Sequence, residues 1–209
     1  MKFMGARNRS KVLSWRAGLS SQGCRKTALL AAALFWASCD QTPDPRELEG
    51  ALAYMAQALE ADQGERLYRL LDERSRHALI SIHADRRAAA EIVRTRYPED
   101  ARAEALAELG DGAQAESPDA LFARRCDRAC RDDLMESVGA PVEQHREGEV
   151  LVVKTSRDRE LRFYRQREGQ WWGFVWRTEA LDHERDVASR DLRQIERNAE
   201  IFQRREALE

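Results

Sequence analysis

The sequence lacks the motifs that usually identify an enzyme. It has no glycine-rich phosphate loop, no His-Glu-x-x-His zinc motif and no Gly-x-Ser-x-Gly nucleophile turn. We therefore nominate no catalytic residue and no cofactor. The apolar run at 28–37 has only ten residues, whereas a helix that spans a bilayer needs about 20. A permanent membrane span is therefore not expected.

Acidic side chains are absent from the start of the chain, and lysine is nearly absent from the rest. The first 39 residues contain no acidic side chain, and Lys154 is the only lysine after them. Because the first 39 residues carry +7 and the whole chain carries −2, the remainder carries −9. An acidic remainder argues against a nucleic-acid partner and against a polybasic membrane patch.

The N-terminal segment has the three-part pattern of a secretory signal peptide. A basic stretch precedes the apolar residues 28–37, and small residues follow them. We interpret residues 1–38 as this signal. The alternatives are a signal peptide cut at another position and a buried helix that ends in a cysteine.

Trp36-Ala37-Ser38-Cys39 resembles the lipobox of bacterial lipoproteins, in which the cysteine is lipidated and becomes the first mature residue. The last three residues fit that motif, whereas Trp36 departs from the aliphatic residue usual there. The resemblance implies acyl chains such as palmitate on Cys39. A single acyl chain binds a membrane only weakly, so several acyl chains on Cys39 would be needed for a stable anchor and would supply it. The protein would then lie in the bacterial cell envelope, anchored to a membrane with its domain outside the cytoplasm.

Residues 39–47 are expected to form the lipidated N-terminus and a short polar tether, because two prolines occur between Asp40 and Pro45. Apolar residues then recur at helical spacing. Leu48, Leu52, Met55 and Leu59 form the first such stripe. The predicted helices cover residues 46–61, 67–96, 100–109 and 119–137.

The apolar period then changes from 3.6 residues to 2, which predicts strands over 142–146, 149–155, 160–166 and 171–178. Short turns between the strands indicate an antiparallel meander. The expected core face comprises Leu151, Val153, Leu161, Phe163, Trp172, Phe174 and Trp176. The predicted fold class is α+β: N-terminal helices packed on a C-terminal four-stranded antiparallel meander, in a domain over 48–178.

A C-terminal amphipathic helix is expected over 179–209. Its apolar residues follow a 4-3-4-3 spacing typical of a heptad seam. They are Ala188, Leu192, Ile195, Ala199 and Phe202. Two interpretations stay open. The helix packs back on the domain, or it is an arm that binds a protein partner.

The order of the elements resembles the NTF2-like, or cystatin-like, superfamily. The stretch 165–172, Arg-Gln-Arg-Glu-Gly-Gln-Trp-Trp, is similar to the last turn of its small secreted lipoprotein members. Residues 58–62 followed by 67–71 are similar to the opening helices. The resemblance implies an NTF2-like fold over 48–178, and the C-terminal helix is a departure from it. Enzymes, binding modules and scaffolds all share this fold, so it specifies no activity.

Cys126 and Cys130 are an even pair one helical turn apart, in a compartment that permits disulfides. They could form a disulfide, remain buried thiols, or supply half of a zinc site. Zinc needs four ligands, and His145 and His183 do not lie at a diagnostic spacing. A metal is therefore not expected.

The sequence supports two hypotheses about function. The first is a non-catalytic, membrane-anchored envelope lipoprotein that binds or scaffolds a partner protein, with the C-terminal helix as the contact. The second is a small-molecule pocket lined by Trp172, Phe174 and Trp176, since sheets of this kind often enclose one. An NTF2-like enzyme would require an ionisable pair inside that pocket.

Overall fold

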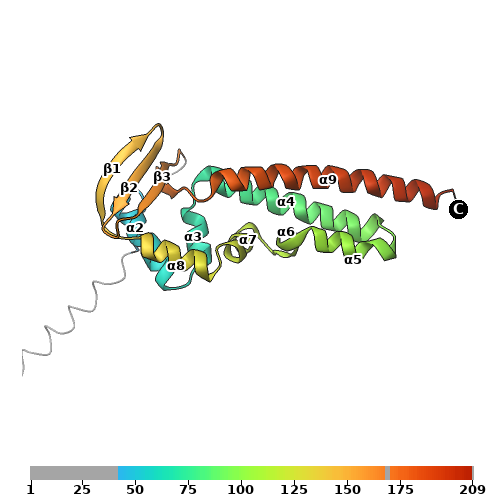
Figure 1. Ribbon diagram of the computed structural model, residues 1–209, viewed down its shortest axis with the longest axis horizontal. Helices are drawn as coiled ribbons and strands as arrows, with labels where there is room; N and C mark the ends of the chain where they lie inside the picture. Colours follow the sequence, from blue (N-terminus) through green and yellow to red (C-terminus); the bar gives the residue numbers. More distant parts are fainter. Residues whose placement is uncertain (1–41, 168–169, 209) are drawn as a thin grey trace, which may run out of the picture. The chain divides into compact units, whose positions relative to one another are not determined.

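The computed structural model describes residues 42–167 and 170–208. The predicted signal peptide and Cys39 lie outside these residues. Within them, helices precede a four-stranded antiparallel sheet and one long helix follows it, so the α+β prediction is confirmed (Figure 1). The helices are α2 (Leu48–Glu60), α3 (Gly64–Leu70), α4 (Glu73–Arg96), α5 (Glu99–Glu108), α6 (Gly110–Gln114), α7 (Pro118–Arg125), α8 (Arg128–Ser137) and α9 (Thr178–Glu206). The strands are β1 (Pro141–Glu147), β2 (Val150–Thr155), β3 (Glu160–Arg165) and β4 (Trp172–Phe174).

The order of the strands in the sheet follows the chain, β1-β2-β3-β4. Every neighbouring pair is antiparallel, as in a meander. Gly148 in the β1–β2 turn has φ +62°, which glycine adopts at no steric cost. All seven predicted core-face side chains are buried: Leu151, Val153, Leu161, Phe163, Trp172, Phe174 and Trp176. The last strand is shorter than predicted and ends at Phe174. The chain turns at Arg177, whose φ is +47°, and enters α9 directly.

The inner face of the sheet and the surrounding helices share the larger of two hydrophobic clusters. Leu52 and Met55 of α2 contribute to it, as their helical spacing predicted. Phe122 of α7 packs edge to face on Trp176 at a centroid distance of 4.9 Å. Leu181, near the start of α9, belongs to the same cluster. The first part of the C-terminal helix is therefore part of the domain core.

Beyond this core, α4 and α9 continue side by side, with α5 and α6 packed against α4 (Figure 1). We call residues 84–114 and 188–206 the arm. α4 and α9 run parallel, because Arg74 pairs with Asp182 near their starts, and Tyr97, just after the end of α4, stacks on Phe202 near the end of α9. A second hydrophobic cluster holds the arm together, formed by Ala89, Ala90, Val93, Tyr97, Leu109 and Ala199.

Two predicted helices are each divided in the structure. The helix expected over 67–96 breaks between α3 and α4, and the helix expected over 119–137 breaks between α7 and α8. In both places an aspartate, Asp72 or Asp127, caps the second helix by accepting hydrogen bonds from its free backbone N–H groups. In so charged a sequence a capping aspartate looks like any surface acid, so periodicity did not reveal either break.

The first described residues are folded against the domain. The Trp172 N–H donates to the Pro45 carbonyl at 2.8 Å. A Cβ on Gly50 would lie 1.9 Å from the Asp44 carbonyl oxygen, so these two backbones touch directly. The latter part of the predicted tether, residues 44–47, is therefore held on the domain. No helix among the described residues combines the length and the apolar character needed to cross a bilayer.

Candidate functional site

Trp172, Phe174 and Trp176 lie in the domain core. Their exposed fractions are 7%, 6% and 5%, and none of them lines either of the two hollows described below. Phe174 packs on Phe163 at a centroid distance of 6.1 Å. The pocket-lining role predicted for these side chains has no support in either hollow. Here they act as core residues.

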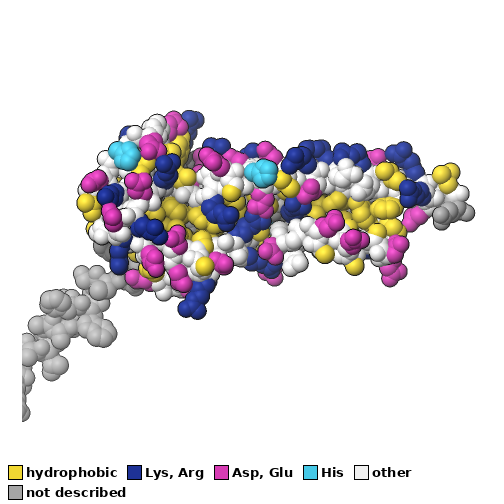
Figure 2. Space-filling model, in the orientation of Figure 1, with side chains coloured by type: hydrophobic (Ala, Val, Ile, Leu, Met, Phe, Trp, Pro, Cys, Tyr) yellow, Lys and Arg dark blue, Asp and Glu magenta, His cyan; other side chains and the backbone are white. Residues whose placement is uncertain are grey.

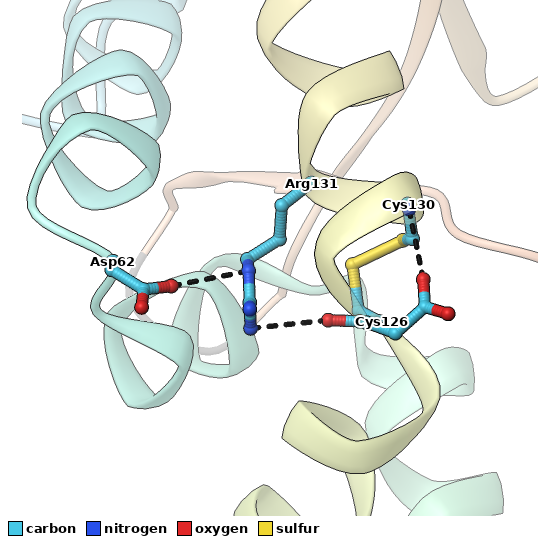
Figure 3. The surroundings of a disulfide bond; sticks show 5 residues. Asp62, Cys126, Cys130 and Arg131 are labelled. Carbon is cyan, nitrogen blue, oxygen red and sulfur yellow. Dashed lines mark hydrogen bonds and ion pairs between the residues drawn. A yellow bond between two sulfur atoms is a disulfide. The ribbon is translucent and has the colours of Figure 1, made fainter.

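Cys126 and Cys130 lie at disulfide distance, with Cα atoms 5.0 Å apart (Figure 3). The sequence predicted both cysteines within one helix. In the structure they lie on either side of the break between α7 and α8. Cys126 is buried. Arg131 donates to the Cys126 carbonyl at 3.3 Å and pairs with Asp62 at 3.1 Å. The bridge and this arginine together fix the corner between the two helices.

A polar cluster, buried except at its partly exposed Thr178, joins the starts of α4 and α9 and is here called the latch. It consists of Asp72, Ser75 and Thr178. The Asp72 carboxylate accepts a hydrogen bond from the Ser75 hydroxyl. The Ser75 oxygen also lies 3.2 Å from the Trp176 carbonyl and 3.2 Å from the Thr178 hydroxyl. Ser75 has no exposed surface. A hydroxyl that substrate cannot reach is no nucleophile, so the latch is structural.

Gln166 extends the latch toward the sheet. Its Nε2 donates to the Leu71 carbonyl at 2.8 Å, and its Oε1 accepts from Arg76 at 2.8 Å. Gln166 is only 2% exposed, so both contacts are shielded from water. Sequence reasoning missed these residues. The one available signal was the capping position of Asp72 three residues before Ser75.

The larger hollow, about 1080 Å³, lies between the outer sheet face and the starts of α4 and α9. Its charged lining comprises Arg74, Arg162, Arg177 and Arg185 with Asp72, Glu73, Glu149 and Glu179. Several of these charges are already paired: Arg74 and Arg185 with Asp182, and Arg162 with Glu147. The hydrogen bond from Tyr164 to the Glu149 carboxylate raises the pKa of Tyr164. The hollow therefore carries charges of both signs, and three of its four arginines are already paired.

The smaller hollow, about 330 Å³, lies on the arm between α5 and α9, and we call it the arm groove. Its floor is apolar, formed by Tyr97, Ala101, Ala105, Leu109 and Ile195. Figure 2 shows hydrophobic side chains gathered there between the two helices. Glu104 and Glu108 stand on its α5 side, and no described residue forms an ion pair with either. On the other sides the groove is lined by the paired Arg86 and Asp191 and by Gln194 and Asn198. The groove therefore has an apolar floor, polar walls and unpaired negative charge along its α5 rim.

The apolar seam predicted on the C-terminal helix faces α4. Ala188 and Ala199 are buried, and Leu192, Ile195 and Phe202 pack on the arm cluster. This contact agrees with the interpretation that the helix packs back on the domain. The opposite face of α9 is exposed and rich in arginine.

His145 and His183, which were considered as further zinc ligands and not expected to be so, are separate from the cysteines in the fold. His145 lies on β1 beside Glu147, and His183 lies on α9. Over the described ranges 42–167 and 170–208, no three His, Cys, Asp or Glu side chains are grouped to hold a metal ion.

Comparisons with known proteins give no relative for this chain. No family model, no curated protein and no solved structure matches it.

Proposed function

We propose that this protein is a lipid-anchored lipoprotein of the bacterial cell envelope, and that its folded unit is a non-catalytic scaffold that holds a partner protein through the arm. The observation that carries the anchor is the position of Cys39. The compact unit begins at Thr42, three residues after the cysteine of the lipobox-like Trp36–Cys39.

The docked segment 44–47 supports a close anchor. Because Pro45 is hydrogen-bonded to β4, only about four residues would separate the lipidated Cys39 from the domain. Each extended residue spans about 3.3–3.6 Å, so the domain would be held near the headgroups. Its acidic charge would then keep that surface from adhering to anionic lipid.

Two features support a scaffold rather than an enzyme. The buried Ser75 hydroxyl is bonded within the latch, and the larger hollow has balanced charges. The similarity to NTF2-like proteins stays part of this proposal, since it implies helices on one face of an antiparallel meander. The arm is the addition to which we assign partner binding, because it exposes a groove and an arginine-rich helix face.

The test of the anchor is the intact mass of the protein extracted from its native membrane. We expect a chain that begins at a diacylated or triacylated Cys39. The variant Cys39→Ser should lose the lipid and leave the membrane fraction or remain unprocessed. Cys24→Ser is the matched control, since it removes the other N-terminal cysteine, and it should change neither mass nor fractionation beyond the substitution itself. An unlipidated, soluble chain cut at another residue would contradict the anchor.

A further inference from the structure

We propose that the arm groove is filled by α9 of a second copy of this chain, in a parallel two-fold dimer. The proposal deepens the proposed function by naming the partner of the arm, and it rests on the arm alone. It needs no lipid. The two sides of the contact, the groove and the outer face of α9, are both exposed on the described surface.

The first side is the arm groove. Its floor is apolar, and Glu104 and Glu108 on α5 have no ion-pair partner among the described residues. α4, α5 and α9 surround the groove on three sides, as three helices of a four-helix arrangement would. A helix that filled the fourth position would bury the floor and neutralise the rim if it were basic.

The second side is the outer face of α9. Arg193, Arg197 and Ile201 follow one another at four-residue spacing and therefore share one face. Arg197 is nine residues from the buried Ala188, which places it about 180° around the helix. Neither arginine pairs with a carboxylate in the described residues; Arg193 donates to Ser189 and Arg197 to Gln194. Ile201 is 45% exposed. Glu200 lies on this face as well but pairs with Arg204. The face is therefore basic overall with an apolar side chain at its edge, which complements the groove.

The acidic rim on α5 and the arginines on α9 also lie at the same position along the axis of the arm. Glu104 and Glu108 line the groove together with Gln194 and Asn198 of the same chain, so they stand at the level of residues 193–198. α5 runs back along the arm, because it follows the far end of α4. In a parallel dimer, Arg193 of one copy would therefore lie near Glu108 of the other copy, and Arg197 near Glu104.

A two-fold axis parallel to α9 is the symmetry that meets both requirements. It places each α9 in the groove of the other copy and turns each outer face toward the partner's α5, so the contact is made twice. An antiparallel axis would instead bring α4 of one copy into the space of the partner's α5. The parallel axis leaves both Thr42 ends on the same side, which suits two chains anchored in one membrane.

A charge-swap experiment tests the dimer with the full chain. Two tagged copies are expressed together, extracted in mild detergent, and captured through one tag. Variant X carries Glu104→Arg and Glu108→Arg; variant Y carries Arg193→Glu and Arg197→Glu. Wild type should capture wild type. X with X, and Y with Y, should each fall at least tenfold, because like charges then face one another.

Co-expression of X with Y is the decisive measurement. In that pair arginines of X face glutamates of Y on one half, and the natural charges face one another on the other half, so capture should return to near the wild-type amount. Recovery also shows that both variants are folded. The matched controls are Glu49→Arg with Glu136→Arg, and Arg146→Glu with Arg157→Glu, which make the same charge changes at exposed positions away from the arm. Both should capture themselves normally.

Absence of capture between wild-type copies would overturn the dimer, and so would capture of X by Y no better than of X by X. The intact mass reports on the anchor and the capture reports on the arm, so failure of one proposal is distinguishable from failure of the other.

Discussion

At the scale of single residues, Asp72 has two tasks. Its carboxylate accepts the backbone N–H groups of Arg74 at 3.0 Å and Ser75 at 3.1 Å, which caps α4. It also accepts the Ser75 hydroxyl inside the latch. Asp72→Ala should therefore cost about 2 kcal/mol of unfolding free energy, the upper range for a lost cap. Urea unfolding followed by circular dichroism would measure it.

The control for this prediction is Asp72→Asn. Asparagine caps helices about as well as aspartate, so the loss should be well below that of the alanine variant. Equal losses for the two variants would show that the charge, and not the cap, stabilises this junction.

Tyr68 gives a prediction about pH. Burial raises the pKa of its phenol, the nearby Arg76 opposes this, and Asp119 adds to it. Because the folded-state pKa lies above the unfolded value of about 10, the folded state holds the phenolic proton more tightly. The stability contribution is present below about pH 10 and is lost as the pH rises further. Phenolate absorbance, compared with Tyr68→Phe, should show Tyr68 ionising later than a free tyrosine; ionisation at the ordinary pH would contradict this.

Single residues also show which features of the fold could be predicted from the sequence and which could not. Leu52, Met55, Val153 and Phe163 were predicted in the core and are buried there, because apolar spacing depends only on local geometry. Nothing in the local sequence distinguishes Asp72 from a surface acid. Its role depends on Phe174, whose carbonyl accepts the Asp72 N–H and which lies about a hundred residues away in the sequence. No local pattern contains that contact.

At the scale of elements, the corner between α7 and α8 depends on the Cys126–Cys130 pair. The bridge closes a loop of five residues, for which chain entropy gives about 2 kcal/mol. Cys126→Ala with Cys130→Ala should therefore lower the unfolding free energy by about that amount, measured in urea without reductant.

The control for the disulfide prediction is the wild-type chain in reductant. It should lose a similar amount and gain the mass of two hydrogen atoms. No gain in mass on reduction would show that the thiols are not bridged. The sequence predicted the pair but placed it within one helix, since the Asp127 cap between the cysteines is not visible as a break.

The sheet was the element most fully predicted. Its short turns specify antiparallel neighbours, and its alternation specifies the inner face. β4 was predicted too long because Trp176 continues the alternation. The strand ends at Phe174, and the chain turns into α9 at Arg177 for a tertiary reason: the latch holds the start of α9 against α4.

At the scale of the whole described unit, two hydrophobic clusters share α4 and α9. Leu181 and Ala188 of α9 belong to the larger cluster, whereas Ala199 belongs to the arm cluster. Truncation after Arg177 should therefore prevent folding. Truncation after Arg190 should leave the sheet and its helices folded, while α5 and α6 lose protection in hydrogen exchange.

The two truncations control each other. Folding of the shorter chain would show that α9 is dispensable for the core. Loss of protection throughout the longer chain would show that the two clusters form one cooperative unit.

The pairing of α4 with α9 also means that α4 is synthesised well before the helix on which it packs. α4 ends at Arg96, and its partner begins about 80 residues later at Thr178. At ribosomal speeds of about 5–20 residues per second, roughly 4–16 s pass between them. During that time α5, α6 and α7 can cover part of α4, but the face of α4 that packs on α9 stays uncovered. A cell that makes this chain must keep that apolar face from aggregating, and the core can close only after the first turns of α9, with Leu181 and Ala188, have been made.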